Sequence, residues 1–210
     1  MAPTPPEWKV RTWYNRPWLC VLRHPDATVR SKIAELAKAA ALNDKIGYDQ
    51  GTVGNPEDRY SFWAQLKTVN YNPAKITKAC ETDCSAGVAA IVKAAGYILG
   101  VQKLKDVSIY LYTGNMRSAF KTAGFEVLTA SKYLTSDAYL LAGDILLNDN
   151  HHVATNLDNG SSSGSGSADA GSSGSRLNDT AKWTGYVDAD ALNVRTWAGT
   201  EYGTCSFSPL

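Results

Sequence analysis

A low-complexity stretch divides this chain and limits what can fold on either side of it. Residues 161–175 consist almost entirely of Ser, Gly, Ala and Asp. Such a segment cannot bury apolar surface, so it behaves as a flexible tether. We therefore expect one main domain at residues 1–158, a linker at residues 159–181 and a short remainder at residues 182–210. The first part has the length of a single domain with one core.

Charge and hydropathy exclude several classes of partner. The formal net charge is +1 and charged residues make up 20% of the chain, so no long-range field favours nucleic acid or an acidic membrane surface. No apolar run reaches the ~20 residues needed to span a bilayer. The opening Met1 to Pro6 lacks the basic and apolar regions of a secretion signal. We expect no signal peptide, no membrane contact and no nucleic-acid partner.

The spacing of apolar residues predicts an α+β fold in which helices pack on a small antiparallel sheet. Expected strands lie at 7–14, 20–22, 125–128, 143–147 and 152–157. Expected helices lie at 26–42, 61–69, 84–95 and 113–123, and the third of them is expected to stop at Gly96. The glycine-rich residues 46–60 are expected to form a surface loop.

One cysteine and one histidine stand out as candidates for catalysis. Cys84 follows Asp83 at the start of a predicted helix, and His152 opens the second strand of a predicted hairpin. A helix N-terminus and a nearby imidazolium can lower a cysteine pKa from ~8.5 by several units. A histidine on a rigid strand can accept the thiol proton and return it to the leaving amine. Buried structural cysteines at helix starts are equally common, so the pattern alone leaves both roles open.

The remaining cysteines and histidines are weaker candidates. Cys20, Cys80 and Cys205 are too few and too irregular for a disulfide scaffold. Cys80, Cys84, His151 and His152 together offer four possible zinc ligands. Adjacent residues on a strand point to opposite faces, which weighs against a zinc site at His151 and His152. We expect free thiols, no metal and no cofactor.

Two linked motifs carry a resemblance to a known family. Asp83-Cys84-Ser85 precedes an Ala/Val-rich helix, and Gly143-Asp144-Ile-Leu-Leu is followed by His151-His152-Val-Ala. In this order they resemble the NlpC-type cysteine peptidases, papain-like hydrolases of peptidoglycan. The resemblance covers residues 8–158. It implies a papain-like fold, with a tyrosine beside the nucleophile that Tyr48 would match.

Further motifs resemble phage and prophage endolysins of Gram-positive hosts. Ile46-Gly-Tyr-Asp-Gln50, the Asp-Cys-Ser helix, Tyr112-Thr-Gly-Asn-Met116 and the Gly-Asp strand recur in that order. Residues 13–23 are similar to the closing strand of related catalytic domains, which here precedes the cysteine and implies a partly permuted arrangement. The resemblance implies a monomer stored in the host cytoplasm until lysis, with peptidoglycan as its partner.

Two further features bear on the resemblance: the C-terminal residues 187–202 and the residue that would orient the catalytic histidine. Residues 187–202 resemble the first strands of a bacterial SH3-type cell-wall-binding domain, cut short in this chain. The peptidase family usually has a third polar residue that orients the catalytic histidine. No histidine follows His152, so we expect either an incomplete site or a substitute such as Asn156.

The resemblance implies a cysteine mechanism on the peptidoglycan stem peptide. Cys84 would attack an amide, His152 would transfer the proton, and a backbone N–H at the helix start would stabilise the oxyanion. Tyr48 would hydrogen-bond near the nucleophile, while Asp83 and Ser85 would shape the helix start and contact substrate. The expected bond joins D-glutamate to the diamino acid. An N-acetylmuramoyl-L-alanine amidase on the same fold and a catalytically silent wall-binding protein remain open.

Overall fold

The structure, a computed structural model, describes residues 7–51, 57–149, 151–162 and 186–188. Within these ranges the main sheet has the strand order β1-β8-β7-β6-β2-β5, and every neighbouring pair is antiparallel. Its strands are β1 (Lys9–Arg11), β2 (Cys20–Arg23), β5 (Glu126–Leu128), β6 (Ile145–Asn148), β7 (His152–Asn156) and β8 (Tyr186–Asp188). A separate parallel pair joins β3 (Ile46–Tyr48) to β4 (Cys80–Thr82).

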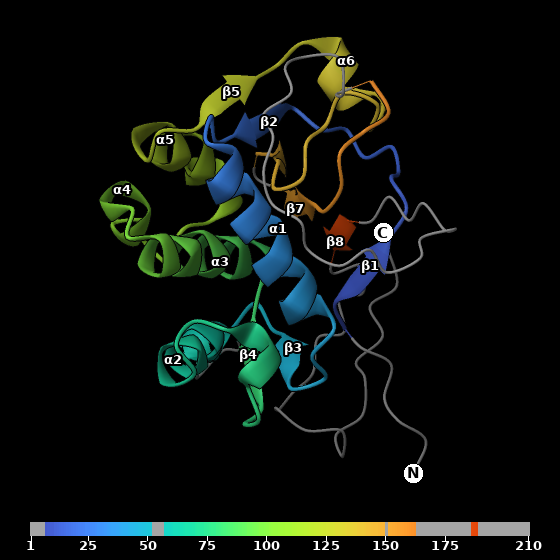
Figure 1. Cartoon of the computed structure of the whole chain (residues 1–210). Coiled ribbons are helices and arrows are strands. Elements are labelled where there is room, and N and C mark those ends of the chain that lie inside the picture. Colours follow the sequence, from blue (N-terminus) through green and yellow to red (C-terminus); the bar gives the residue numbers. More distant parts are fainter. Residues whose placement is uncertain (1–6, 52–56, 150, 163–185, 189–210) are drawn as a thin grey trace, which may run out of the picture.

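The helices are α1 (Ala27–Ala41), α2 (Ser61–Thr68), α3 (Cys84–Leu99), α4 (Gln102–Lys105), α5 (Thr113–Thr122) and α6 (Ser131–Leu134), with short 3₁₀ turns at Asp58–Tyr60 and Pro73–Lys75. Helices α1, α3 and α5 pack on one face of the main sheet, whereas Tyr133 and Leu134 of α6 pack against the core on the other face. Figure 1 shows α1 and α3 crossing each other between β7 and the smaller helices. The arrangement is the α+β fold that the sequence predicts.

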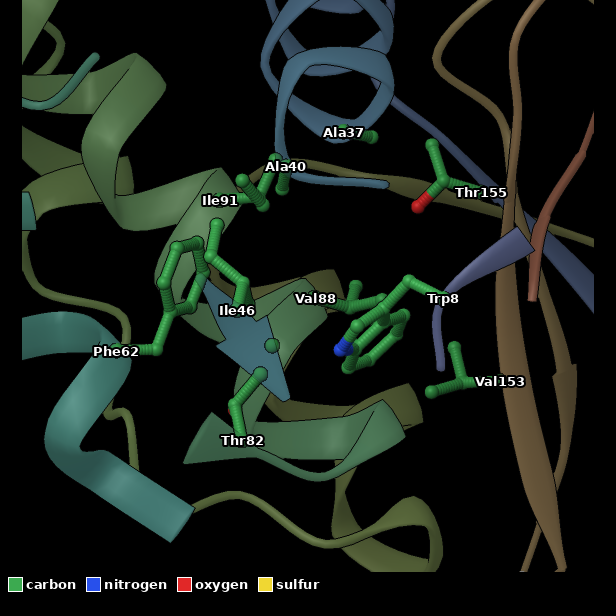
Figure 2. A pocket seen from close by; sticks show the side chains of 11 residues that line it. Trp8, Ala37, Ala40, Ile46, Phe62, Thr82, Val88, Ile91, Val153 and Thr155 are labelled. Atoms are coloured by element: carbon green, nitrogen blue, oxygen red, sulfur yellow. The ribbon is translucent and has the colours of Figure 1, made fainter. Parts of the chain in front are cut away.

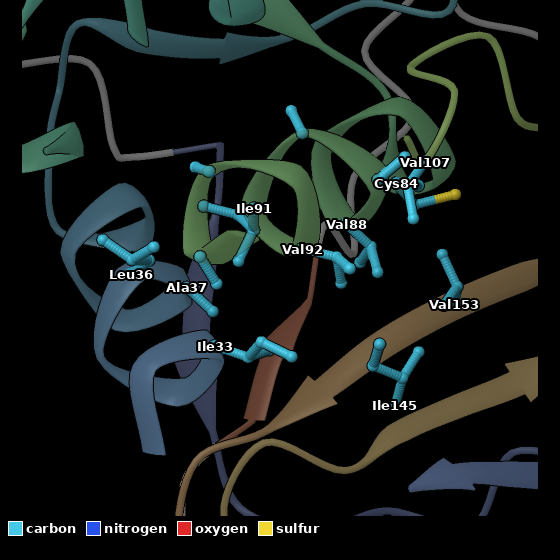
Figure 3. Close-up of a cluster of buried hydrophobic side chains, with 14 of the residues drawn as sticks. Ile33, Leu36, Ala37, Cys84, Val88, Ile91, Val92, Val107, Ile145 and Val153 are labelled. Atoms are coloured by element: carbon cyan, nitrogen blue, oxygen red, sulfur yellow. The ribbon is translucent and has the colours of Figure 1, made fainter. Parts of the chain in front are cut away.

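The two faces of the sheet carry separate cores because successive side chains on a strand alternate. On the helical face, Ile145 and Val153 pack against Ile33 of α1 and against Val88 and Val92 of α3 (Figure 3). On the other face, residues from β2, β6 and β7 pack with an N-terminal tryptophan; this second core is Trp18, Val21, Leu140, Leu146 and Ala154. Each fully buried aliphatic side chain contributes about 1.5–3 kcal/mol.

Most of the expected elements are present. Helix α1 begins after Asp26, whose side chain accepts a hydrogen bond from the Thr28 N–H at 2.7 Å, as an N-cap does. The hairpin β6–β7 has His152 at the start of its second strand, paired with Asn148. Strand β2 lies inside the sheet, between β6 and β5. An N-terminal segment therefore supplies an interior strand of the sheet, while the partly permuted, papain-like arrangement stays a prediction.

Two sequence expectations are wrong in detail. Residues 46–60 are not all loop, because Ile46 and Tyr48 are buried in β3, whose partner β4 follows a long intervening segment. Helix α3 does not stop at Gly96 but continues to Leu99 and ends at Gly100, where φ is +73°. Gly96 serves close packing instead, since a Cβ there would lie 2.6 Å from the Leu104 Cβ.

The C-terminal part of the chain is described only at β8. This strand pairs with β7 on one side and β1 on the other. Residues 163–185 and 189–210 lie outside the described ranges, so the linker and the SH3-type tail stay predictions, as does the division into domains. Among the described helices, none has the length and apolarity needed to cross a bilayer.

Candidate functional site

Cys84 is the first residue of α3, and its position follows from a local capping signal. The Asp83 side chain accepts hydrogen bonds from the Ala86 N–H and from the Ser85 hydroxyl, each at 2.7 Å. Both Asp83 and Ser85 are buried. They shape the start of the helix, as predicted, while their contact with substrate stays a prediction.

Three groups from different parts of the chain hydrogen-bond the Cys84 sulfur. They are the Tyr48 hydroxyl from β3, the Val153 N–H from β7 and the Ser85 N–H of the same helix. Figure 3 shows Cys84 at the end of α3 that lies toward Val153 of β7. The structure therefore brings together Tyr48, the Asp-Cys-Ser turn and the backbone directly after His152.

The electrostatics of Cys84 differ from the sequence expectation. Burial raises the pKa of the Cys84 thiol to about 11, and the charge of Asp83 acts in the same direction. The hydrogen bonds from Tyr48, Val153 and Ser85 lower it by less. The thiol is therefore neutral at rest near pH 7, and a base must remove its proton during attack rather than before it.

Tyr48 is held in place from several sides. The β3–β4 pair fixes its backbone, and the Tyr48 N–H donates to the Glu7 carboxylate at 2.6 Å. Its ring packs on Trp8 with a centroid distance of 5.5 Å, and the Gln50 amide donates to its hydroxyl at 3.2 Å. Burial raises the pKa of Tyr48 above its usual value, so its hydroxyl remains a donor at neutral pH.

His152 is buried on the face of the sheet opposite to α1 and α3. Its ring lies against Trp18 with a centroid distance of 6.1 Å, whereas the side chain of Val153, the next residue, joins the helical core. Asn148 stands directly opposite His152 in the β6–β7 register, which places both side chains on the same face. The Asn148 amide donates to the Pro17 carbonyl at 2.8 Å, and this contact fixes its orientation.

Asn156 does not orient His152. Its amide nitrogen donates to the carbonyls of Leu141 and Asp158, each at 2.7 Å. It also lies four residues along β7 from His152, about 13 Å at the rise of an extended strand. The prediction of Asn156 as a substitute third residue is therefore wrong, because its amide is used at the far end of the strand.

Charged side chains surround the helix start. Arg59 forms an ion pair with Asp83 at 3.2 Å. In the described part of the chain, the one group of three or more possible metal ligands comprises Asp49, Asp58 and Glu81, whose ligand atoms lie within 4.8 Å of one another. Burial and the neighbouring carboxylates raise the pKa of Glu81 to about 7. The cysteine and histidine residues weighed as zinc ligands do not form such a group within the described ranges.

A small apolar pocket lies between α1, α3, β3 and β7, and Trp8 and Val153 of its lining are neighbours of Tyr48 and His152. Figure 2 shows Trp8 projecting into it between Val88, Val153 and the helix α1 residues Ala37 and Ala40. Its volume of about 20 Å³ has room for about one water molecule. A stem peptide cannot bind there.

Comparison with known proteins gives one assignment. Residues 3–163 match the endolysin-like domain family. The chain belongs to this family. Membership supports a phage-type cell-wall lytic enzyme. It does not identify the NlpC-type subtype, the peptidoglycan bond that is cut or the catalytic mechanism. No curated protein matches the chain, and no solved structure does.

Several residues at this endolysin-like site were missed by sequence reasoning. Trp8, Arg59 and Asn148 carry no local motif, and the Val153 N–H is a backbone group that no side-chain pattern reveals. The repeated large residues at 7–14 predicted a strand, but not that Trp8 would pack against Tyr48.

Proposed function

We propose that this chain is a cysteine hydrolase that cuts an amide of the peptidoglycan stem peptide, with Cys84 as nucleophile and His152 as base. The observation that carries the proposal is a cysteine at the start of a buried helix whose sulfur is hydrogen-bonded by Tyr48, Val153 and Ser85. Membership of the endolysin-like family supports peptidoglycan as the substrate and the cell wall as the place of action. Storage in the host cytoplasm until lysis is part of the proposal.

The chemistry proceeds by acyl transfer. Because the thiol is neutral at rest, the proposed mechanism requires the His152 ring to turn from its place beside Trp18 toward Cys84. His152 then removes the thiol proton as the sulfur attacks the amide carbonyl. A backbone N–H at the start of α3 stabilises the negative oxygen of the tetrahedral intermediate. His152 then protonates the leaving amine, and water hydrolyses the thioester to release the new carboxylate and restore the thiol. Tyr48 stabilises the developing thiolate by donating to it, while Asp83 and Ser85 hold the helix start against substrate.

Asn148 is the third residue in this proposal. Its amide nitrogen is occupied by the Pro17 carbonyl, so its carbonyl oxygen is the group that can face the imidazole on the same side of the sheet. Accepting a hydrogen bond from one ring nitrogen would hold His152 in the tautomer that leaves the other nitrogen free to act as base. Asn148 is thus a positioning residue.

Among amide bonds, the proposal names the one between D-glutamate and the diamino acid. The experiment is digestion of purified Gram-positive walls by the chain beside a Cys84→Ala variant, with released fragments identified by mass. An Ala-Glu dipeptide left on the sugar supports the proposal, whereas bare muramic acid would assign an N-acetylmuramoyl-L-alanine amidase. Equal activity of the two proteins would exclude Cys84 as the nucleophile.

A catalytically silent wall-binding protein is the second candidate, favoured by one observation: the Cys84 side chain is only 6% exposed and its thiol pKa is raised. Co-sedimentation with walls in the absence of any released fragment would establish it.

A further inference from the structure

Two exposed tyrosines lie on the loop between α4 and α5 and have no role in the proposed reaction. Tyr110 is 60% exposed and Tyr112 is 56% exposed, while Leu111 and Thr113 beside them are buried. Tyr112 opens the Tyr-Thr-Gly-Asn-Met motif. Buried and exposed side chains alternate along this loop. The buried residues anchor its backbone, and the two tyrosine rings face solvent.

Tyr110 is supported by a third aromatic ring. It packs edge-to-face on Tyr60 with a centroid distance of 4.6 Å and an interplanar angle of 71°. The guanidinium of Arg59 lies 4.8 Å from the Tyr60 ring centroid. Such pairs hold rings in one orientation, so little conformational freedom would be lost when a ligand stacks on Tyr110.

The same contacts connect these rings to the nucleophile. Arg59 is ion-paired at 3.2 Å with Asp83, the residue directly before Cys84. The rings therefore flank the start of α3. In the stem peptide, two residues separate the sugar from the D-glutamyl bond, a span of about 7 Å in an extended chain. A substrate whose scissile amide lies at Cys84 would thus bring its sugar close to this tyrosine cluster.

We propose that the tyrosine cluster, which is the packed pair Tyr60 and Tyr110 together with the exposed Tyr112 two residues further along the loop, binds N-acetylhexosamine rings of the glycan strand. A pyranose ring offers a flat face of C–H groups bordered by hydroxyls. Tyrosine matches it with an apolar ring face and a hydroxyl at the tip. The cluster would place the glycan while Cys84 acts on the peptide. This inference rests on the proposed function for its substrate, but the binding itself can be measured without turnover.

The test compares Tyr110→Ala with Tyr110→Trp and with a matched control, Tyr139→Ala. Tyr139 is 40% exposed and packs on Tyr133 of α6, away from the helix start. Each variant is assayed on a disaccharide-tetrapeptide wall fragment and on the same peptide without sugar. We expect Tyr110→Ala to raise KM roughly three- to tenfold, the size of one lost ring contact, on the sugar-bearing substrate only. Tyr110→Trp and Tyr139→Ala should remain near the parent.

A parallel loss on both substrates would overturn the inference, and so would no loss on either. If the parent chain cuts neither substrate, the proposed function has failed. The inference about the tyrosine cluster is then tested by oligosaccharide binding, which needs no turnover. In the Cys84→Ala chain, titration with β-1,4-linked tetra-N-acetylglucosamine followed by NMR should perturb the resonances of Tyr60, Tyr110 and Tyr112. Binding that Tyr110→Ala leaves unchanged, or no binding at millimolar oligosaccharide, would contradict the inference.

Discussion

Cys80 and Cys84 are close in sequence and similarly buried, yet only one of them lies at a site. Their exposed fractions are 4% and 6%, and burial raises their pKa values to about 12 and about 11. Cys80 opens β4, and the charge beside it, on Glu81, raises its pKa further. Cys84 opens α3 and receives hydrogen bonds from Tyr48, Val153 and Ser85. Burial alone therefore does not distinguish a nucleophile, whereas donors aimed at the sulfur do.

Removing each thiol gives the largest expected contrast. Cys84→Ala should lower wall hydrolysis by at least ~10³-fold, because the attacking atom is lost. Cys80→Ala should leave the rate within about threefold and lower the free energy of unfolding by ~1 kcal/mol, since only packing changes. Turbidity loss of purified walls and thermal denaturation measure the two effects. If both variants lose activity to a similar extent, the loss at Cys84 would be explained by disturbed packing, and Cys84 would not be assigned as the nucleophile.

The proton acceptor for Cys84 is tested next, by comparing the two neighbouring histidines. His152→Ala should lower kcat by about 10²–10⁴-fold, as loss of a general base does. His151→Ala should have little effect, because His151 is exposed in the hairpin turn. Asn148→Ala should lower kcat less than His152→Ala and shift the pH profile, since it changes only the orientation of the ring. If His151→Ala proves the more damaging variant, the base has been misassigned.

Alkylation rates compare the two thiols directly in the unmodified protein. Because hydrogen bonds lower the pKa of the Cys84 thiol while the charge on Glu81 raises that of Cys80, the thiolate fraction of Cys84 should exceed that of Cys80 at any pH below 10. Iodoacetamide labelling, read by peptide mass spectrometry, should rise about tenfold per pH unit for both from pH 7 to 10. A Cys84 rate that is already level at pH 7 would instead indicate a standing thiolate–imidazolium pair.

The smallest effect concerns Glu81, the charge beside Cys80. Its pKa in the folded protein is raised to about 7, so its contribution to stability is complete below its unfolded pKa and is lost as the pH rises through 7. Glu81→Gln keeps the uncharged shape. It should raise Tm by roughly 2–4 °C at pH 8, a value limited by partial solvent screening of this carboxyl, and have little effect at pH 4. An equal shift at both pH values would exclude the charge as the cause.

Local sequence signals specify several elements of this protein. Asp83 followed by an Ala/Val-rich run specifies a capped helix beginning at Cys84, and alternation around residues 143–157 specifies the hairpin that carries His152. These signals depend on neighbours within a few residues. The α+β class and the resemblance to endolysins followed from them, and the family match over residues 3–163 agrees.

Which distant groups meet at the Cys84 sulfur depends on how the elements pack together. Tyr48 reaches Cys84 because β3 pairs with β4 and Trp8 packs against its ring, and Val153 contributes a backbone N–H that sequence cannot mark. The raised pKa of Cys84 was likewise invisible, because desolvation depends on everything packed around the thiol rather than on its place at a helix N-terminus. Pairing and burial are properties of the assembled fold, and they set the chemistry of this cysteine.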